Sequence, residues 1–261
     1  MSKFYAFLIG IALLFVGCSG NKSSSKVITV GATPVPHAEI LEFIKPILAK
    51  DGYTLEIKVF NDYVIPNLAV FNGEIDANFF QHTPYLIEFN KNKNTDLVKT
   101  VAVHIEPIGI YSTKLKSIDD LASGGKIAIP NDPTNGNRAL EVLQNAGIIK
   151  LADKEIKTKL DIIENPKNIE IVDIEAPQLP RSIGDFDLSV INTNYALAAN
   201  LNPARDALVL ESKDSPYANI LVVKKGNENK DAIKALDKAL TSEDTRKFIR
   251  EKYKGAIVEA F

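Results

Sequence analysis

Two segments of the sequence group side chains that could form the wall of a pocket for a small molecule. The first, residues 60–67 (Phe-Asn-Asp-Tyr-Val-Ile-Pro-Asn), directly follows a predicted strand. The second, residues 76–86, places two phenylalanines, a tyrosine and a histidine around a predicted turn. Aromatic side chains most often belong to a hydrophobic core. The polar Gln81 and His82 between these aromatic residues favour instead a slot for a flat or polarisable apolar group.

A third segment, residues 130–138, lies between a predicted strand and a predicted helix and could bind an anion. The free N–H groups at the start of a helix favour negative charge. Arg138, expected in the first turn, could hold a carboxylate through two parallel hydrogen bonds, although an exposed arginine on a helix is an equally open interpretation. The phosphate-loop pattern Gly-x-x-x-x-Gly-Lys is absent. Residues 191–195 and 215–219 place further amides at strand ends, where asparagine also serves ordinary turns.

Catalytic and metal-binding patterns are absent from the sequence. The three histidines (His37, His82 and His104) do not have metal-ligand spacing, and the chain has a single cysteine. No Gly-x-Ser-x-Gly motif is present, and no pair of carboxylates stands out as a general acid and base. We therefore expect a binding protein that is not an enzyme and that needs no cofactor or metal.

The elements that must position these segments alternate between strand and helix along the chain. Strand patterns occur at 27–32, 55–59, 126–130, 169–174 and 188–191, and helix patterns at 40–48, 62–71, 138–146, 230–240 and 243–253. This alternation predicts an α/β fold with mostly parallel sheets that are covered by helices on both faces. A single sheet is possible, but the length favours two lobes: residues 27–108 plus 220–261, and residues 109–219. Ligands of such folds bind at strand ends and between domains.

The N-terminus has the composition of a secretory signal peptide, predicted over residues 1–17. Lys3 precedes an apolar run over 4–16, which is too short to remain as a membrane span. Cys18 follows a small residue, as in the processing box of bacterial lipoproteins, although Phe15 stands where leucine is usual. A lone cysteine in a secreted chain cannot form an internal disulfide, so we expect Cys18 to carry lipid (palmitate included) rather than to be incidental. Residues 18–26 would then be a lipidated N-terminus and a flexible tether.

Charge and composition limit the partners of the mature chain. The full sequence of 261 residues has 31 Lys and Arg against 33 Asp and Glu, and loss of Lys3 with the signal leaves about −3. There is no basic excess for nucleic acid and no polybasic membrane patch. We expect a lipid-anchored domain outside the cytoplasm, on the cell membrane or the outer membrane.

Several blocks in the same order give the chain a resemblance to a known family. They are Gly31–His37, Phe60–Asn67, Asp76–Leu86, Pro130–Asn135, Glu164–Asn168, Glu175–Arg181, Ile191–Thr193 and Ser215–Asn219. The chain resembles, over residues 27–261, the methionine-binding lipoproteins of the NlpA/MetQ family, which are solute receptors of bacterial ABC importers. The resemblance implies a two-lobed periplasmic-binding-protein fold that closes on L-methionine and delivers it, as a monomer, to a membrane permease driven by an ATPase.

The resemblance also implies roles for individual residues of this sequence. The side-chain pocket would be lined by Tyr63, Phe80, His82 and Tyr85; the α-carboxylate would pair with Arg138; and the α-amino and carboxylate groups would be held by Asn192 and Asn219. Gly136-Asn137 and Thr83 depart from the usual family pattern without removing a proposed contact. A methionine-containing dipeptide or another small apolar amino acid is an alternative ligand, and a surface adhesin that needs no small ligand is an alternative from a different class.

Overall fold

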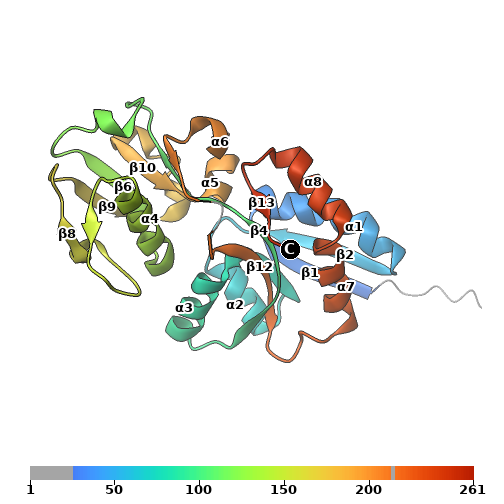
Figure 1. Cartoon of the computed structure of the whole chain (residues 1–261). Helices are drawn as coiled ribbons and strands as arrows, with labels where there is room; N and C mark the ends of the chain where they lie inside the picture. The colour runs from blue at the N-terminus through green and yellow to red at the C-terminus, as the bar shows by residue number, and fades with distance from the viewer. Residues whose placement is uncertain (1–25, 213–214) are drawn as a thin grey trace, which may run out of the picture.

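The computed structural model describes residues 26–212 and 215–261, which form two lobes that lie side by side (Figure 1). The predicted signal peptide, Cys18 and nearly all of the predicted tether fall in residues 1–25, outside the described part of the chain. In the described residues, no helix combines the length and the apolar character needed to cross a membrane.

The first lobe is built on a six-stranded sheet in the order β13-β4-β12-β3-β1-β2. Its strands are β1 (Lys26–Ala32), β2 (Tyr53–Val59), β3 (Ala77–His82), β4 (Leu97–Ile105), β12 (Ala218–Lys224) and β13 (Val258–Glu259). β1 pairs in parallel with β2 and β3, whereas β12 runs antiparallel to both β3 and β4. The parallel half is the part that the alternation of strands and helices in the sequence predicts.

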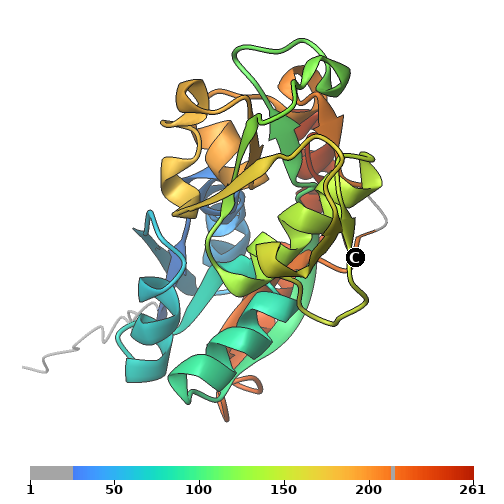
Figure 2. The same ribbon diagram turned by 90° about the vertical axis from the view of Figure 1, so that its left-hand side faces the viewer.

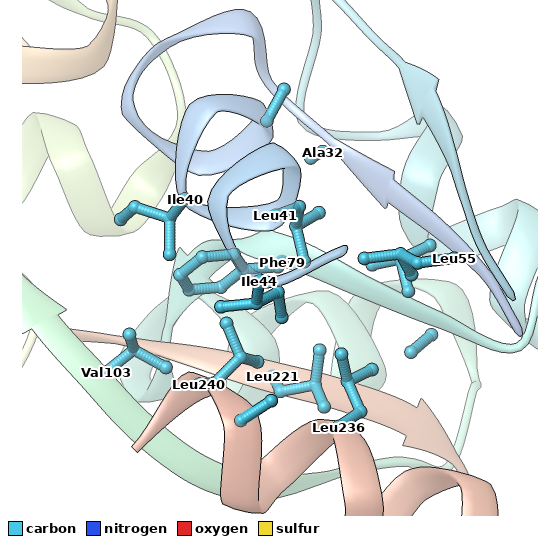
Figure 3. Packing of buried hydrophobic residues seen from close by; sticks show 14 of the residues in the cluster. Ala32, Ile40, Leu41, Ile44, Leu55, Phe79, Val103, Leu221, Leu236 and Leu240 are labelled. Carbon is cyan, nitrogen blue, oxygen red and sulfur yellow. The ribbon is translucent and has the colours of Figure 1, made fainter. Parts of the chain in front are cut away.

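Helices cover both faces of this sheet. They are η1 (Pro34–Ala38), α1 (Glu39–Lys50), α2 (Ile65–Asn72), α3 (Thr83–Lys93), α7 (Asp231–Leu240) and α8 (Glu243–Tyr253). Successive side chains of β12 point to opposite faces: Leu221 and Val223 join the core under α1, α7 and α8, and Ile220 and Val222 join the core under α2 and α3. Figure 3 shows Leu221 packed with Ile44 of α1 and Leu240 of α7 in the larger of these two cores.

The second lobe is built on a five-stranded sheet in the order β11-β5-β10-β6-β9. Its strands are β5 (Gly109–Tyr111), β6 (Lys126–Pro130), β9 (Glu170–Ile174), β10 (Leu188–Ile191) and β11 (Val209–Leu210), with a separate pair formed by β7 (Lys150–Leu151) and β8 (Ile162–Glu164). Its helices are η2 (Ile118–Asp120), α4 (Pro133–Asn145), η3 (Lys159–Asp161), η4 (Ala176–Gln178), η5 (Ile183–Asp185), α5 (Thr193–Ala198) and α6 (Pro203–Asp206). Alternation again divides the core, because Ile127 and Ile129 of β6 face α4 whereas Ala128 packs on the opposite face with Tyr195 of α5.

The chain crosses between the lobes twice, after β4 and again between Leu210 and Ala218. The outgoing and returning segments pair antiparallel in both lobes, β4 with β12 and β5 with β11. This explains why both sheets are mixed, whereas the sequence predicts mostly parallel sheets. The α/β fold with two lobes is confirmed. Asn219 lies in β12 and so belongs to the first sheet, although the boundary expected from the sequence follows it.

Candidate functional site

Helices α3 and α4 lie side by side where the two lobes meet (Figure 2), and a cavity lies beside their N-terminal ends. The cavity encloses about 330 Å³ of space between the atoms, the open solvent at its mouth included. All seven residues that the sequence analysis selects line it: Tyr63, Phe80, His82, Tyr85, Arg138, Asn192 and Asn219. The first four and Asn219 come from the first lobe, and Arg138 and Asn192 from the second, so both lobes contribute to one site.

One end of the cavity is aromatic. Phe80 reaches it because β3 alternates, with Phe79 directed into the core under α1 and Phe80 directed the other way. The Tyr63 and Phe80 rings are stacked with centroids 5.6 Å apart, and the Tyr85 ring meets Tyr63 edge-on at 5.7 Å. The Tyr85 hydroxyl donates to the Tyr63 carbonyl at 3.1 Å, which holds the two side chains in this arrangement. The sequence predicts a turn within residues 76–86; the structure instead has strand β3 running directly into helix α3.

His82 lies at that junction and is held as a neutral imidazole. Its Nδ1 accepts from the Tyr85 backbone N–H at 3.2 Å and so caps α3, which leaves the proton on Nε2. Nε2 lies 3.2 Å from Oδ1 of Asn135, across the boundary between the lobes. Burial, and secondarily the positive charge of Arg138, lowers the pKa of His82 from 6.5 to about 3. The ring therefore presents a neutral edge to the cavity at ordinary pH.

Arg138 is almost fully buried, with 3% of its side chain exposed, and it is paired with a residue that the sequence analysis does not select. Its Nε donates to Oε1 of Glu211 at 2.9 Å, and its Nη2 donates to Oε2 of the same carboxylate. Nη2 also donates to the Glu106 carbonyl at 2.7 Å. Nη1 has no hydrogen-bond partner within residues 26–212 and 215–261, so it is the guanidinium nitrogen that is available to another anion. Helix α4 begins at Pro133, which places Arg138 in its second turn and not the expected first.

The start of α4 is occupied by a side chain of the protein itself. Asp132 caps the helix by accepting from the Asn135 backbone N–H at 2.9 Å. Both of its oxygens also accept from Asn135 Nδ2, at 3.1 and 3.0 Å. Asn135 Oδ1 in turn accepts from Asn192 Nδ2 at 2.8 Å. The anion site that the sequence analysis expects at this helix start is therefore filled by a carboxylate of the chain.

A second line of hydrogen bonds reaches the cavity from the first lobe. Thr33 Oγ1 lies 2.7 Å from His37 Nδ1, and His37 Nε2 lies 3.1 Å from Asn219 Oδ1 and 3.1 Å from Oε1 of Glu106. A carboxylate only accepts hydrogen bonds, so His37 Nε2 carries the proton and the Thr33 hydroxyl donates to Nδ1. Asn219 Oδ1 is used by this contact, and Asn219 Nδ2 has no partner among the described residues. The amide thus offers its donor side to a ligand.

Glu106 is a buried carboxylate between two histidines. Its Oε1 accepts from His104 Nε2 at 2.7 Å as well as from His37. Burial raises the pKa of Glu106, opposed by its attraction to His37 and Arg138, and burial lowers the pKa of His37 to about 4 and that of His104 to about 3. His37, His104 and Glu106 are the one group in the described chain with metal-ligand atoms this close, within 4.8 Å of one another. Their nitrogens facing Glu106 are already used as donors, which accounts for the cluster without a metal.

The lobes are in direct contact around the cavity. The Tyr63 hydroxyl donates to Asn194 Oδ1 at 2.6 Å, and the Tyr195 hydroxyl donates to the Asn61 carbonyl at 3.3 Å. Both bonds join the segment between β2 and α2 to α5 of the second lobe. Together with the contact between His82 and Asn135, they describe a closed cleft.

The structure adds site residues that the sequence analysis did not select. The charged ones, Glu106 and Glu211, lie at the two crossovers, and the uncharged ones that line the cavity are Gln81, Asn135, Thr193 and Asn194. The four uncharged residues all lie within segments already singled out in the sequence, and Gln81 is named there as a possible pocket residue. The dipeptide Asp132-Pro133 is a helix-start pattern that predicts the beginning of α4 at Pro133. Neither glutamate has a local pattern, because its role depends on where the chain crosses between lobes.

Comparisons with known proteins agree on one family. A model of the NlpA lipoprotein family matches residues 28–261. The methionine-binding lipoprotein MetQ of Bacillus subtilis is 44% identical over 269 residues, covering 97% of both chains. A solved nutrient-binding protein of Burkholderia cenocepacia, bound to methionine, has a TM-score of 0.88 and 44% identity, and covers 90% of this chain and 100% of its own. A periplasmic substrate-binding protein of an ABC transporter from Coxiella burnetii has a TM-score of 0.86 and 38% identity, and covers 89% and 100% respectively.

Proposed function

The chain belongs to the NlpA lipoprotein family, and we propose that it is a methionine-binding lipoprotein of a bacterial ABC transporter. It would act as a receptor and not as an enzyme. The observation that supports this proposal is that the two ends of the cavity differ in polarity. One end is a group of aromatic rings, and the other end has a free arginine nitrogen and two asparagine amides. A free amino acid with an apolar, polarisable side chain has the same division between its two ends.

The aromatic end suits a thioether. Sulfur near the edge of an aromatic ring gains about 0.3–1.5 kcal/mol per contact. Tyr63, Phe80 and Tyr85 present both ring faces and ring edges to the cavity, since Tyr63 is nearly parallel to Phe80 and nearly perpendicular to Tyr85. His82 also contacts this end of the cavity. Its ring is neutral, so it adds no charge that would lack a partner on a thioether.

The polar end suits a zwitterion. The α-carboxylate would receive hydrogen bonds from Arg138 Nη1 and Asn219 Nδ2, two donors that have no partner among the described residues. The α-ammonium would donate to Asn192 Oδ1, a buried acceptor without a partner, and would lie near the buried charge of Glu106. A buried charge is stable only when it is paired, so the ligand and the site would each neutralise the other.

Ligand binding would favour the closed arrangement of the lobes. Aromatic contacts come from the first lobe, and the Arg138 and Asn192 contacts come from the second, so only the closed cleft provides all of them. A ligand shifts a conformational equilibrium by its difference in affinity for the two states. We propose that a membrane permease, driven by an ATPase, recognises the closed form of this monomeric receptor.

The membrane anchor would be lipid on Cys18, which becomes the mature N-terminus and places the folded domain outside the cytoplasm. The family match supports a lipoprotein, and the sequence around Cys18 supports the site of attachment. Substitution Cys18→Ser should move the chain from the membrane fraction to the soluble fraction. Retention in the membrane fraction would exclude this cysteine as the anchor.

Ligand-dependent melting tests the proposed function directly. Residues 22–261 would be unfolded and refolded to remove bound ligand, then melted with L-methionine, D-methionine, other amino acids or glycyl-methionine. A ligand at about 100 times its dissociation constant adds about 2.7 kcal/mol of stability, which should raise the melting temperature by roughly 5–10 °C for a protein of this size. A shift with L-methionine supports the proposal, and a shift with the dipeptide alone would change the substrate but not the class. No shift with any of them would favour an adhesin-type interaction protein.

A further inference from the structure

We propose that Asp132 is a positioning residue that determines which way round the ligand binds, by fixing the orientation of the Asn192 amide. This inference rests on the proposed function, because it concerns the α-ammonium of an amino-acid ligand. Asp132 lines no part of the cavity that contains Arg138 and Asn192. It acts on the ligand only through Asn135.

The first step is the contact between Asp132 and Asn135. A carboxylate accepts hydrogen bonds and cannot donate them. Asp132 accepts from the Asn135 backbone N–H, from Asn135 Nδ2 and from the Thr134 hydroxyl, the last at 3.1 Å. The Asn135 side chain must therefore turn its NH₂ group toward Asp132 and its oxygen toward the cavity.

The second step is the contact between Asn135 and Asn192. Asn135 Oδ1 has two donors in front of it, His82 Nε2 at 3.2 Å and Asn192 Nδ2 at 2.8 Å. The His82 nitrogen must be a donor, because its other ring nitrogen accepts from the Tyr85 backbone. Asn192 therefore also presents its NH₂ group to Asn135, and this direction follows from the chemistry of the chain of contacts alone.

The third step concerns the side-chain oxygen of Asn192, which is available to a ligand. Its Oδ1 is buried and has no hydrogen-bond partner in the described part of the chain, although Asn192 lines the cavity. Buried polar atoms are nearly always paired, so an unpaired acceptor beside a cavity indicates a donor on the ligand. If the amide turned over, the same position would present an NH₂ group, which repels an ammonium. Asp132 thereby assigns the ammonium to the Asn192 side of the cavity.

The test is the isosteric substitution Asp132→Asn, measured with two ligands. The introduced amide still caps α4, because asparagine is as good a helix cap as aspartate. Unlike the carboxylate, however, it places an NH₂ group opposite Asn135 Nδ2, which opposes the native orientation of Asn135 and leaves that orientation held by the His82 Nε2–H alone. Calorimetry would compare L-methionine with 4-(methylthio)butanoate, which is methionine without the amino group. We expect affinity for L-methionine to fall by about 10- to 100-fold, the value of a hydrogen bond to a charged group. Affinity for the deaminated analogue should change by less than threefold.

A purely structural role for Asp132 would weaken both ligands by the same factor, and that result would overturn the inference. Asp161→Asn is the matched control. Asp161 accepts from the Thr158 backbone and hydroxyl at 2.9 and 3.0 Å in the same lobe, outside this line of contacts. The Asp161→Asn variant should bind both ligands with the affinity of the parent protein. Failure of the parent itself to bind L-methionine would instead contradict the proposed function, so the two failures are distinguishable.

Discussion

Replacement of Arg138 by alanine has two consequences that the structure separates. The side chain is almost fully buried and makes three hydrogen bonds, two to Glu211 and one to the Glu106 carbonyl. Its loss leaves the Glu211 carboxylate, with 12% of its side chain exposed, without a cation and with the Ile108 backbone N–H, at 3.3 Å, as a remaining donor. Breaking a buried pair in this way costs about 3–5 kcal/mol of stability, or a decrease of roughly 6–20 °C in melting temperature for a protein of this size. A loss of binding measured on Arg138→Ala alone could therefore reflect misfolding.

The double variant Arg138→Ala/Glu211→Gln removes that ambiguity. The second substitution removes the unpaired charge, so most of the lost stability should return, as measured by thermal melting. Affinity for L-methionine should stay low, because the α-carboxylate has lost its buried cationic partner. Losing one partner of a buried charge pair costs about 2–5 kcal/mol, which corresponds to roughly 30- to 5,000-fold in dissociation constant. Isothermal titration calorimetry below the melting temperature of each variant measures this change.

Two controls complete the experiment. Glu211→Gln alone keeps the arginine and should lose far less affinity than the double variant. Arg181→Ala removes an exposed arginine of the same lobe and should change neither stability nor affinity. The assignment of the carboxylate to Arg138 is refuted if the double variant binds L-methionine within threefold of Glu211→Gln.

Three further predictions concern closure, pH and the core. Tyr63→Phe removes the bond to Asn194 that joins the lobes and should weaken L-methionine binding by roughly three- to tenfold in calorimetry; unchanged affinity would mean that this bond does not favour closure. The three histidines are buried with pKa values lowered to about 3 or 4, so below pH 6.5 the unfolded chain binds more protons and stability falls. The free energy of unfolding in urea should therefore decrease by up to about 4 kcal/mol per unit between pH 6 and 4, less the opposing effect of Glu106, whose pKa is raised in the fold. A rise in stability over this range would contradict their burial as neutral rings. Leu221→Ala should lower that free energy by about 2–5 kcal/mol, and a change below 1 kcal/mol would show that the core refills.

Elements with one buried face were predictable from the sequence, because their apolar spacing is regular. α8 at 243–253 and β6 at 126–130 lie where the pattern indicates. β3 was missed because all six of its residues are buried, polar ones included, so it does not alternate between apolar and polar. Its polar side chains are satisfied by a distant residue: Asn78 Nδ2 and Gln81 Nε2 both donate to Asn67 Oδ1, at 2.8 and 2.6 Å. Such long-range pairing leaves no periodic pattern in the sequence.

The candidate site was predictable to the extent that its residues lie in unusual local segments. The seven selected residues do line one cavity. Their partners could not be found in the same way, since Glu106 and Glu211 are ordinary glutamates until the fold brings both crossovers to Arg138. A sequence shows which side chains could bind a ligand; which of their atoms remain free depends on tertiary contacts.

The position of the two glutamates suggests an order of events for closure. Glu211 and Ile108, one from each crossover, are joined by the bond from the Glu211 N–H to the Ile108 carbonyl at 2.9 Å. Arg138 is bonded to both crossovers, so it would stay in place when the lobes separate. The contacts of Tyr63 with Asn194 and of His82 with Asn135 join the lobes directly and would break. We therefore expect the carboxylate of the ligand to bind first to Arg138, which the open form already holds, and Asn219 and the aromatic end of the first lobe to close over the ligand afterwards. The Arg138 contact would then be nearly independent of closure, whereas selectivity for the side chain would arise only in the closed state.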